Sequence, residues 1–91
     1  MIRYRRHPEA AVTELEGEAF LVRRDRDAIL RLNPTAAALW RALAEPSTRD
    51  DLVALFAEAF PDVDPGRLAT DIDGALAALS ADGMVAPADD G

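Results

Sequence analysis

The chain of 91 residues contains no cysteine and only one histidine. Without cysteine there are no disulfide bonds, no thiolate metal ligands and no thiol nucleophile. The single imidazole, His7, has no second histidine and no cluster of carboxylates close to it in the sequence, so we expect no metal site. The five glycines are isolated, and no phosphate-binding loop is predicted. These absences favour a binding module without cofactors over an enzyme.

Long apolar runs are also missing. No stretch is long enough to cross a bilayer, and the basic N-terminus is not followed by the apolar core of a signal peptide. We therefore expect no membrane partner and a location in the cytoplasm. The hydrophobic fraction of 49% is that of an ordinary globular protein, and the length suits one domain.

Lysine is absent, and all ten basic residues are arginine against 17 acidic residues, for a net charge of −7. Residues 1–31 carry seven arginines and six acidic residues, whereas residues 32–91 carry three and eleven. A chain of this charge gains little from neutralising phosphates, so we expect no nucleic-acid partner. Residues 1–8 are predicted to form a basic N-terminal arm, followed by one domain over 9–86 and a polar tail over 87–91.

Three apolar segments separated by short polar turns predict an antiparallel meander, with strands at 9–15, 19–22 and 28–32. Three amphipathic segments follow and predict helices over 34–44, from Ser47 to Pro61, and over 65–81. Ser47 is expected to cap the second helix with Asp50, and Gly83 to end the third helix in a left-handed conformation. Met84 and Val85 are expected to form a last short extended piece.

The join between the third strand and the first helix is the most informative stretch. Asn33 follows the strand directly and suits the N-cap, while Pro34 suits the first helical position. No residue is left over for a loop, so the angle between sheet and helix should be fixed. The fold class expected is α+β, with a three-stranded antiparallel sheet followed by three helices in an order like that of winged helix-turn-helix proteins. The core is predicted to comprise Val12, Phe20, Val22, Leu32, Leu39, Trp40, Leu43, Leu52, Phe56, Leu68, Ile72, Leu76 and Leu79.

Two widely separated motifs carry a resemblance to a known family. The segment LNPTAAALW at 32–40 resembles the L-N-x-T-A-x-x-[IL]-W signature of the PqqD family, and DIDGALAAL at 71–79 with GMV at 83–85 resembles that family's ending. DLVALF at 51–56 is similar to its second helix. The resemblance covers about residues 9–86. It implies a small peptide chaperone that recognises the leader of a ribosomally made, post-translationally modified peptide and presents it to a modifying enzyme such as a radical S-adenosylmethionine protein, a protease or a cyclase.

In related domains the leader adds a strand to the third strand and lies against the third helix. The third strand comes last in the predicted meander and should have one unpaired edge. Small and charged residues recur at helical spacing on the facing helix. The expected peptide-binding residues are Ala28, Ile29, Leu30, Arg31 and Leu32 of the strand and Arg67, Asp71, Gly74, Ala75 and Ala78 of the helix; no catalytic residue is expected.

Two other functions stay open at this point. The order of helices also suits a winged-helix DNA-binding transcriptional regulator, although the third helix carries Arg67 against Asp71, Asp73 and Asp82 and would repel phosphate. An adaptor whose groove contacts only a partner enzyme is the third possibility. For Arg31, both a solubilising role at a strand edge and a guiding role for acidic peptide side chains are compatible with the sequence.

Overall fold

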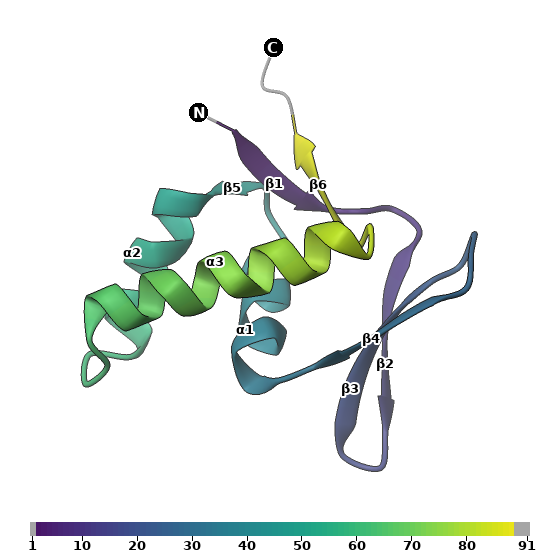
Figure 1. Cartoon of the computed structure of the whole chain (residues 1–91), viewed down its shortest axis with the longest axis horizontal. Helices are drawn as coiled ribbons and strands as arrows, with labels where there is room; N and C mark the ends of the chain where they lie inside the picture. Colours follow the sequence, from purple (N-terminus) through teal and green to yellow (C-terminus); the bar gives the residue numbers. More distant parts are fainter. Residues whose placement is uncertain (1, 89–91) are drawn as a thin grey trace.

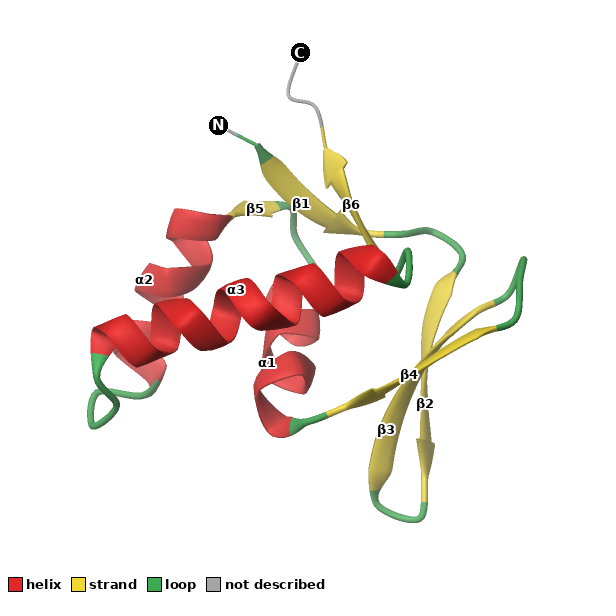
Figure 2. Cartoon of the chain, viewed as in Figure 1, coloured by secondary structure: helices red, strands yellow, loops and turns green. Residues whose placement is uncertain are grey.

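Two small antiparallel sheets flank three helices in the computed structural model, which describes residues 2–88 (Figures 1 and 2). In chain order the elements are β1 (Arg3–Arg6), β2 (Ala10–Leu15), β3 (Glu18–Arg23), β4 (Ala28–Leu32), α1 (Pro34–Ala42), β5 (Ser47–Thr48), α2 (Arg49–Ala59), α3 (Pro65–Ala81) and β6 (Val85–Ala88). The expected α+β class, with a meander followed by three helices, is confirmed. No helix in the described part of the chain is long and apolar enough to cross a membrane.

The meander has the order β2-β3-β4, as the spacing of turns predicts. Val12 pairs with Leu21, and Leu21 pairs with Leu30, so these side chains share one face of the sheet. The turn between β2 and β3 holds Glu16 and Gly17 at positive φ angles of 54° and 80°. That pair of angles is typical of the tight turns whose twist matches the two strands that they join. β4 therefore ends the sheet on one side.

β4 runs directly into α1, as expected. The side chain of Asn33 accepts a hydrogen bond of 2.8 Å from the backbone N–H of Ala36, and Pro34 is the first helical residue. The cap satisfies a donor that the helix itself leaves free. α1 ends at Ala42, two residues before the predicted end, with Leu43 as its C-cap.

The start of α2 differs from the prediction. Thr48, not Ser47, is the N-cap: its hydroxyl accepts from the N–H of Asp51 at 3.0 Å, and the Asp51 carboxylate accepts from the N–H of Thr48 at 3.2 Å. This reciprocal pair is a capping box shifted by one residue from the expected pair of Ser47 and Asp50. The shift arises because Ser47 pairs with β1 as part of β5, so the chain is still extended there.

α3 spans the predicted range, from Pro65 to Ala81. Asp64 caps it by accepting a bond of 3.2 Å from the N–H of Arg67. Gly83 follows the C-cap with a φ of 71°, which confirms the expected left-handed ending. β6 begins at Val85, so only the second residue of the expected short piece at Met84 and Val85 is in a strand. β6 continues to Ala88, which places Pro87 and Ala88 of the expected polar tail in a sheet, and the rest of that tail lies outside the described part.

The expected basic arm is a strand of the fold. β1 pairs with β5 on one side and β6 on the other, so residues from the start, middle and end of the chain form one sheet. Arg6 secures this sheet to α1. Its guanidinium donates two hydrogen bonds, of 3.0 and 2.7 Å, to the carbonyl oxygen of Trp40 and lies 4.6 Å from the centre of the indole ring. The sequence reading missed this sheet because its pairs are remote in the chain.

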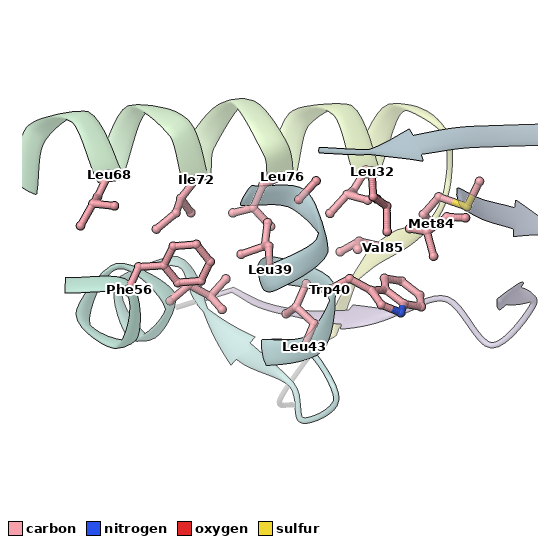
Figure 3. Packing of buried hydrophobic residues seen from close by; sticks show 14 residues of the cluster. Leu32, Leu39, Trp40, Leu43, Phe56, Leu68, Ile72, Leu76, Met84 and Val85 are labelled. Atoms are coloured by element: carbon pink, nitrogen blue, oxygen red, sulfur yellow. The ribbon is translucent and has the colours of Figure 1, made fainter. Parts of the chain in front are cut away.

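The core lies where the three helices meet the inner faces of the two sheets (Figure 3). Ten of the thirteen predicted core residues are buried: Leu32, Leu39, Trp40, Leu43, Leu52, Phe56, Leu68, Ile72, Leu76 and Leu79. The three predicted from β2 and β3 are wrong. Val12 is 50% exposed, and Phe20 and Val22 are only half-buried on the outer face of the sheet. Leu21 points inward instead, and Met84, Val85 and Ala36 complete the buried cluster.

We expect the two cross-strand partners Leu21 and Val12 to differ sharply on truncation. Leu21 is fully buried, so Leu21→Ala should lower the free energy of unfolding by about 2–5 kcal/mol through lost burial and the cavity left behind. Val12→Ala should change it by less than about 1 kcal/mol, because the side chain already contacts water. Urea titrations of both variants measure the difference, and equal losses would contradict the difference in burial between the two side chains.

Candidate functional site

An open groove separates the free edge of β4 from α3. β4 pairs with β3 along Ala28–Leu32, and its other edge has no strand partner among the described residues. Its backbone N–H and C=O groups are therefore available to an added strand. In Figure 1, α3 crosses in front of α1 and its C-terminal half lies alongside this end of the sheet.

Residues from both sides line a hollow of about 450 Å³ in this groove: Leu30, Arg31, Asn33, Thr35, Ala36, Thr70, Asp71, Gly74, Ala75, Ala78 and Leu79. Six of the ten predicted site residues are thus brought together. The helix side is built from the small residues Gly74, Ala75 and Ala78, because α3 turns its large residues toward the core. A Cβ placed on Gly74 would meet no atom within 4 Å, so the space above it is open.

The groove continues past the start of α1 into a second hollow, also of about 450 Å³. The two hollows share Thr35 and Asp71. The second is lined by Pro34, Thr35, Phe56, Phe60, Asp62, Val63, Asp64, Arg67, Leu68 and Asp71. Apolar and charged side chains both line it. The rings of Phe56 and Phe60 lie 5.7 Å apart, and Phe60 is 43% exposed.

The remaining predicted residues lie elsewhere. Arg67 lines the second hollow rather than the first. Ala28 and Ile29 line a shallow hollow at the turn between β3 and β4, and the Ile29 side chain, 71% exposed, points to the outer face of the sheet. Leu32 is buried in the core, so only its backbone remains for a ligand. Phe60 and Val63 were missed, although the spacing of Phe56 and Phe60 on one helix face before Pro61 was a readable signal.

Charged side chains at the groove are already paired. Arg31 donates a hydrogen bond of 2.7 Å to Glu18 on the outer face of the sheet, and Arg67 lies 3.9 Å from Asp71, one helical turn away. All four side chains are exposed, so these pairs contribute little to stability and can exchange partners. The arrangement suits recognition of a chain that carries charged side chains at its flanks.

On the side of α3 away from the groove, Arg49 at the start of α2 donates two hydrogen bonds, of 2.7 and 3.0 Å, to the carboxylate of Asp73. This pair joins the two helices that wall the second hollow. The hydrogen bond from Arg49 is the main cause that lowers the pKa of Asp73 below its ordinary value, and it raises the pKa of Arg49. The described residues include no group of three or more histidine, aspartate or glutamate side chains placed to hold a metal ion.

This arrangement defines a class of small α+β domain in which a sheet edge faces an open helix surface. The family model of PqqD, coenzyme PQQ synthesis protein D, matches residues 18–85. That match covers more than half of the chain, and the protein belongs to the PqqD family. The resemblance found in the two sequence motifs is thereby confirmed.

A solved structure described as lasso peptide synthetase B1 complexed with the leader peptide has a similar fold. The TM-score is 0.74, the sequence identity is 24%, and the match covers 92% of this chain and 98% of that one. A search of the curated proteins finds no match. The fold is therefore shared with a protein of nearly the same extent.

We expect the pKa of Asp73 to rise toward its ordinary value when Arg49 is replaced by Gln, because the main cause of the depression is removed. A carboxylate with a depressed pKa in the folded state stabilises the fold above the pKa of the unfolded state, and that contribution is lost as the pH falls through the folded value. NMR titration of the Asp73 side chain measures the shift. An unchanged pKa in Arg49→Gln would contradict the assigned pair.

Proposed function

We propose that this protein is a non-catalytic module that captures the leader segment of a ribosomally made precursor peptide by strand addition at β4. The observation that carries the proposal is the unpaired edge of β4 beside a groove whose opposite side is made of small residues. Main-chain hydrogen bonds to the edge give affinity without regard to sequence, and pockets beside the edge select side chains. Membership of the PqqD family supports the same function.

The two hollows bind different parts of the peptide. The first, between Leu30 and Ala78, accommodates the peptide backbone with small or alternate side chains. The second, between Phe56 and Phe60, accepts one large apolar side chain beyond the added strand, which fixes the register of the peptide. The carboxylates of Asp62 and Asp64 at its rim favour a basic neighbour of that side chain.

The bound peptide is then presented to a modifying enzyme, such as a radical S-adenosylmethionine protein, a protease or a cyclase, in the cytoplasm. Holding a substrate on a partner of the enzyme raises its local concentration, so the module accelerates modification without taking part in the chemistry. The alternative of a DNA-binding regulator is disfavoured because α3 carries one arginine, Arg67, against the carboxylates of Asp71 and Asp73, so the helix that would enter a DNA groove repels phosphate.

The test uses synthetic peptides encoded by short reading frames beside the gene for this chain. Amide exchange of the protein is measured with and without each peptide. A leader peptide should slow exchange in residues 28–32, where its strand pairs, and in residues 67–78, where it covers α3. Protection confined to β1 or to α2 would contradict the proposed site.

We expect Ala78→Trp to weaken binding of such a peptide by at least about tenfold, or about 1.4 kcal/mol, because the indole fills the groove. Ala78 is exposed, so the fold should tolerate the change. Ala77→Trp is the matched control: it is exposed on the same helix but lines no part of the groove. Calorimetric titration of both variants measures the difference, and equal affinities would argue against the groove.

Gly74→Ala should move stability and binding in opposite directions. Alanine in place of glycine inside a helix adds about 1 kcal/mol to the free energy of unfolding, and the new Cβ meets no atom of this chain. The same methyl group occupies the space into which a peptide backbone must approach, so affinity should fall. Thermal unfolding and peptide titration of the one variant measure both effects. Tighter or unchanged peptide binding would show that the peptide does not approach Gly74 closely.

A further inference from the structure

The β3–β4 hairpin contacts the C-terminal end of α3 through Arg23 and Arg26. We call this contact the corner, and the proposed function does not use it. Three consecutive carbonyl oxygens there accept hydrogen bonds from the side of the sheet: Asp82 from Arg26 Nη2 at 3.0 Å, Gly83 from Arg23 Nη1 at 2.8 Å, and Met84 from the backbone N–H of His7 at 2.9 Å. Two of the three donors are side chains of the β3–β4 hairpin. The hairpin is therefore attached directly to the end of the helix that forms the other wall of the groove.

Arg23 is held firmly in this arrangement. Its side chain is only 8% exposed, and its other donors form a two-pronged pair with the Asp25 carboxylate, with Nε donating to Oδ1 at 2.8 Å. The hydrogen bond from Arg23 is the main cause that lowers the pKa of Asp25, which keeps the carboxylate charged as a partner. One guanidinium thus connects the hairpin turn to the helix end.

Gly83 permits this close approach. Its φ of 71° suits glycine, and a Cβ built on it would lie 2.6 Å from Arg23 Nη1 and closer still to Arg26 Nη2. Any side chain at this position would displace both guanidinium groups. Gly83, which follows the C-cap of α3, therefore also lets the guanidinium groups of Arg23 and Arg26 approach the backbone.

The corner sits at one end of the groove, and the Asn33–Pro34 join sits at the other. Arg23 pairs across the ladder with Ala28, the first residue of β4. α1 follows Leu32 at the far end of the same strand with only the cap residue Asn33 between them. Between these two ends an open hollow separates the exposed edge of β4 from α3, while Leu32 and the half-buried Leu30 belong to the packed core behind it. Because the hollow leaves space between the strand edge and the helix, the contacts at the two ends of β4 help to set the distance between them.

We propose that Arg23 and Arg26 are positioning residues that set the width of the groove between β4 and α3. This inference rests on the proposed function, because groove width matters only if a peptide enters there. With both guanidinium groups in place, the groove is preformed to the width of one added strand. Without them, the Asn33–Pro34 join still holds the C-terminal end of β4, but the turn between β3 and β4 is free to move away from the end of α3, and only part of the population offers the binding width.

The width is measured without any peptide. Because the chain has no cysteine, spin labels attach only at the two introduced positions of Ile29→Cys on β4 and Ala77→Cys on α3, both exposed in the structure. Pulsed electron-spin measurements then give the distribution of distances across the groove. The wild-type background should give one narrow distribution. Arg23→Met and Arg26→Ala should broaden it, and Arg24→Met, an exposed neighbour of equal charge, should not.

Peptide binding gives the second readout, at a temperature where every variant is folded. If a tenth of the Arg23→Met molecules hold the binding width, the apparent Kd for the leader peptide rises about tenfold. Arg24→Met should bind as the wild type does. Arg23→Lys should fall between them, because one ammonium can donate to Gly83 but cannot also form the two-pronged pair with Asp25.

If the two arginines only stabilise the fold, Arg23→Met and Arg26→Ala lower the melting temperature but leave the spin-label distances and the Kd of the folded protein unchanged. That result would overturn the inference. If Arg23→Met does not fold, Arg26→Ala provides the test instead, because Arg26 is exposed and the fold should tolerate its replacement. If the wild type binds no encoded peptide, the proposed function fails, while the spin-label distances still decide whether the two arginines hold the groove.

Discussion

The join between β4 and α1 is the constraint on which the rest of the structure depends. Leu32 belongs to the core, Asn33 caps the helix, and Pro34 begins it, so three consecutive residues each have a fixed task. A flexible loop in their place would let the sheet rotate relative to the helices. Because there is none, the free edge of β4 keeps a defined orientation to α3, which the proposed peptide site requires.

The groove stays open because α3 has two unlike faces. Leu68, Ile72 and Leu79 are buried against α1 and α2, whereas Gly74 and Ala78 face the strand edge. Larger residues there would pack against β4 and close the space. The proximity of α3 also obstructs the approach of a second sheet to the same edge. On the proposal that a peptide adds to β4, its selective capture and the protection against sheet-to-sheet aggregation share one cause.

Local signals in the sequence were sufficient for the helices and much less so for the sheets. Caps and prolines act on neighbouring residues, so α3 was predicted with its full range, and the groove residues on it followed from helical spacing. The inward face of β3 was predicted wrongly. Phe20 and Val22 were assigned to the core, yet they lie on the outer face of the sheet and Leu21 points toward the helices. β1 was missed because its partners β5 and β6 lie more than forty residues away in the chain. Pairing at that range leaves no mark in a local pattern. The spacing of Phe56 and Phe60 was a readable signal, but the second hollow that they line depends on how α2 and α3 pack.

The arginines show why composition alone could not assign their roles. Solubility and recognition of a peptide were the two roles weighed, yet several arginines donate to backbone carbonyls near the ends of helices: Arg6 to Trp40 in α1, and Arg26 and Arg23 to Asp82 and Gly83 after α3. Those carbonyls lack partners within the helix, and the C-terminal end of a helix attracts positive charge. A guanidinium can satisfy such a carbonyl while a second prong binds elsewhere, as Arg23 does with Asp25, whereas an ammonium offers only a single centre. The absence of lysine therefore suits a fold in which arginines attach both sheets to the ends of helices.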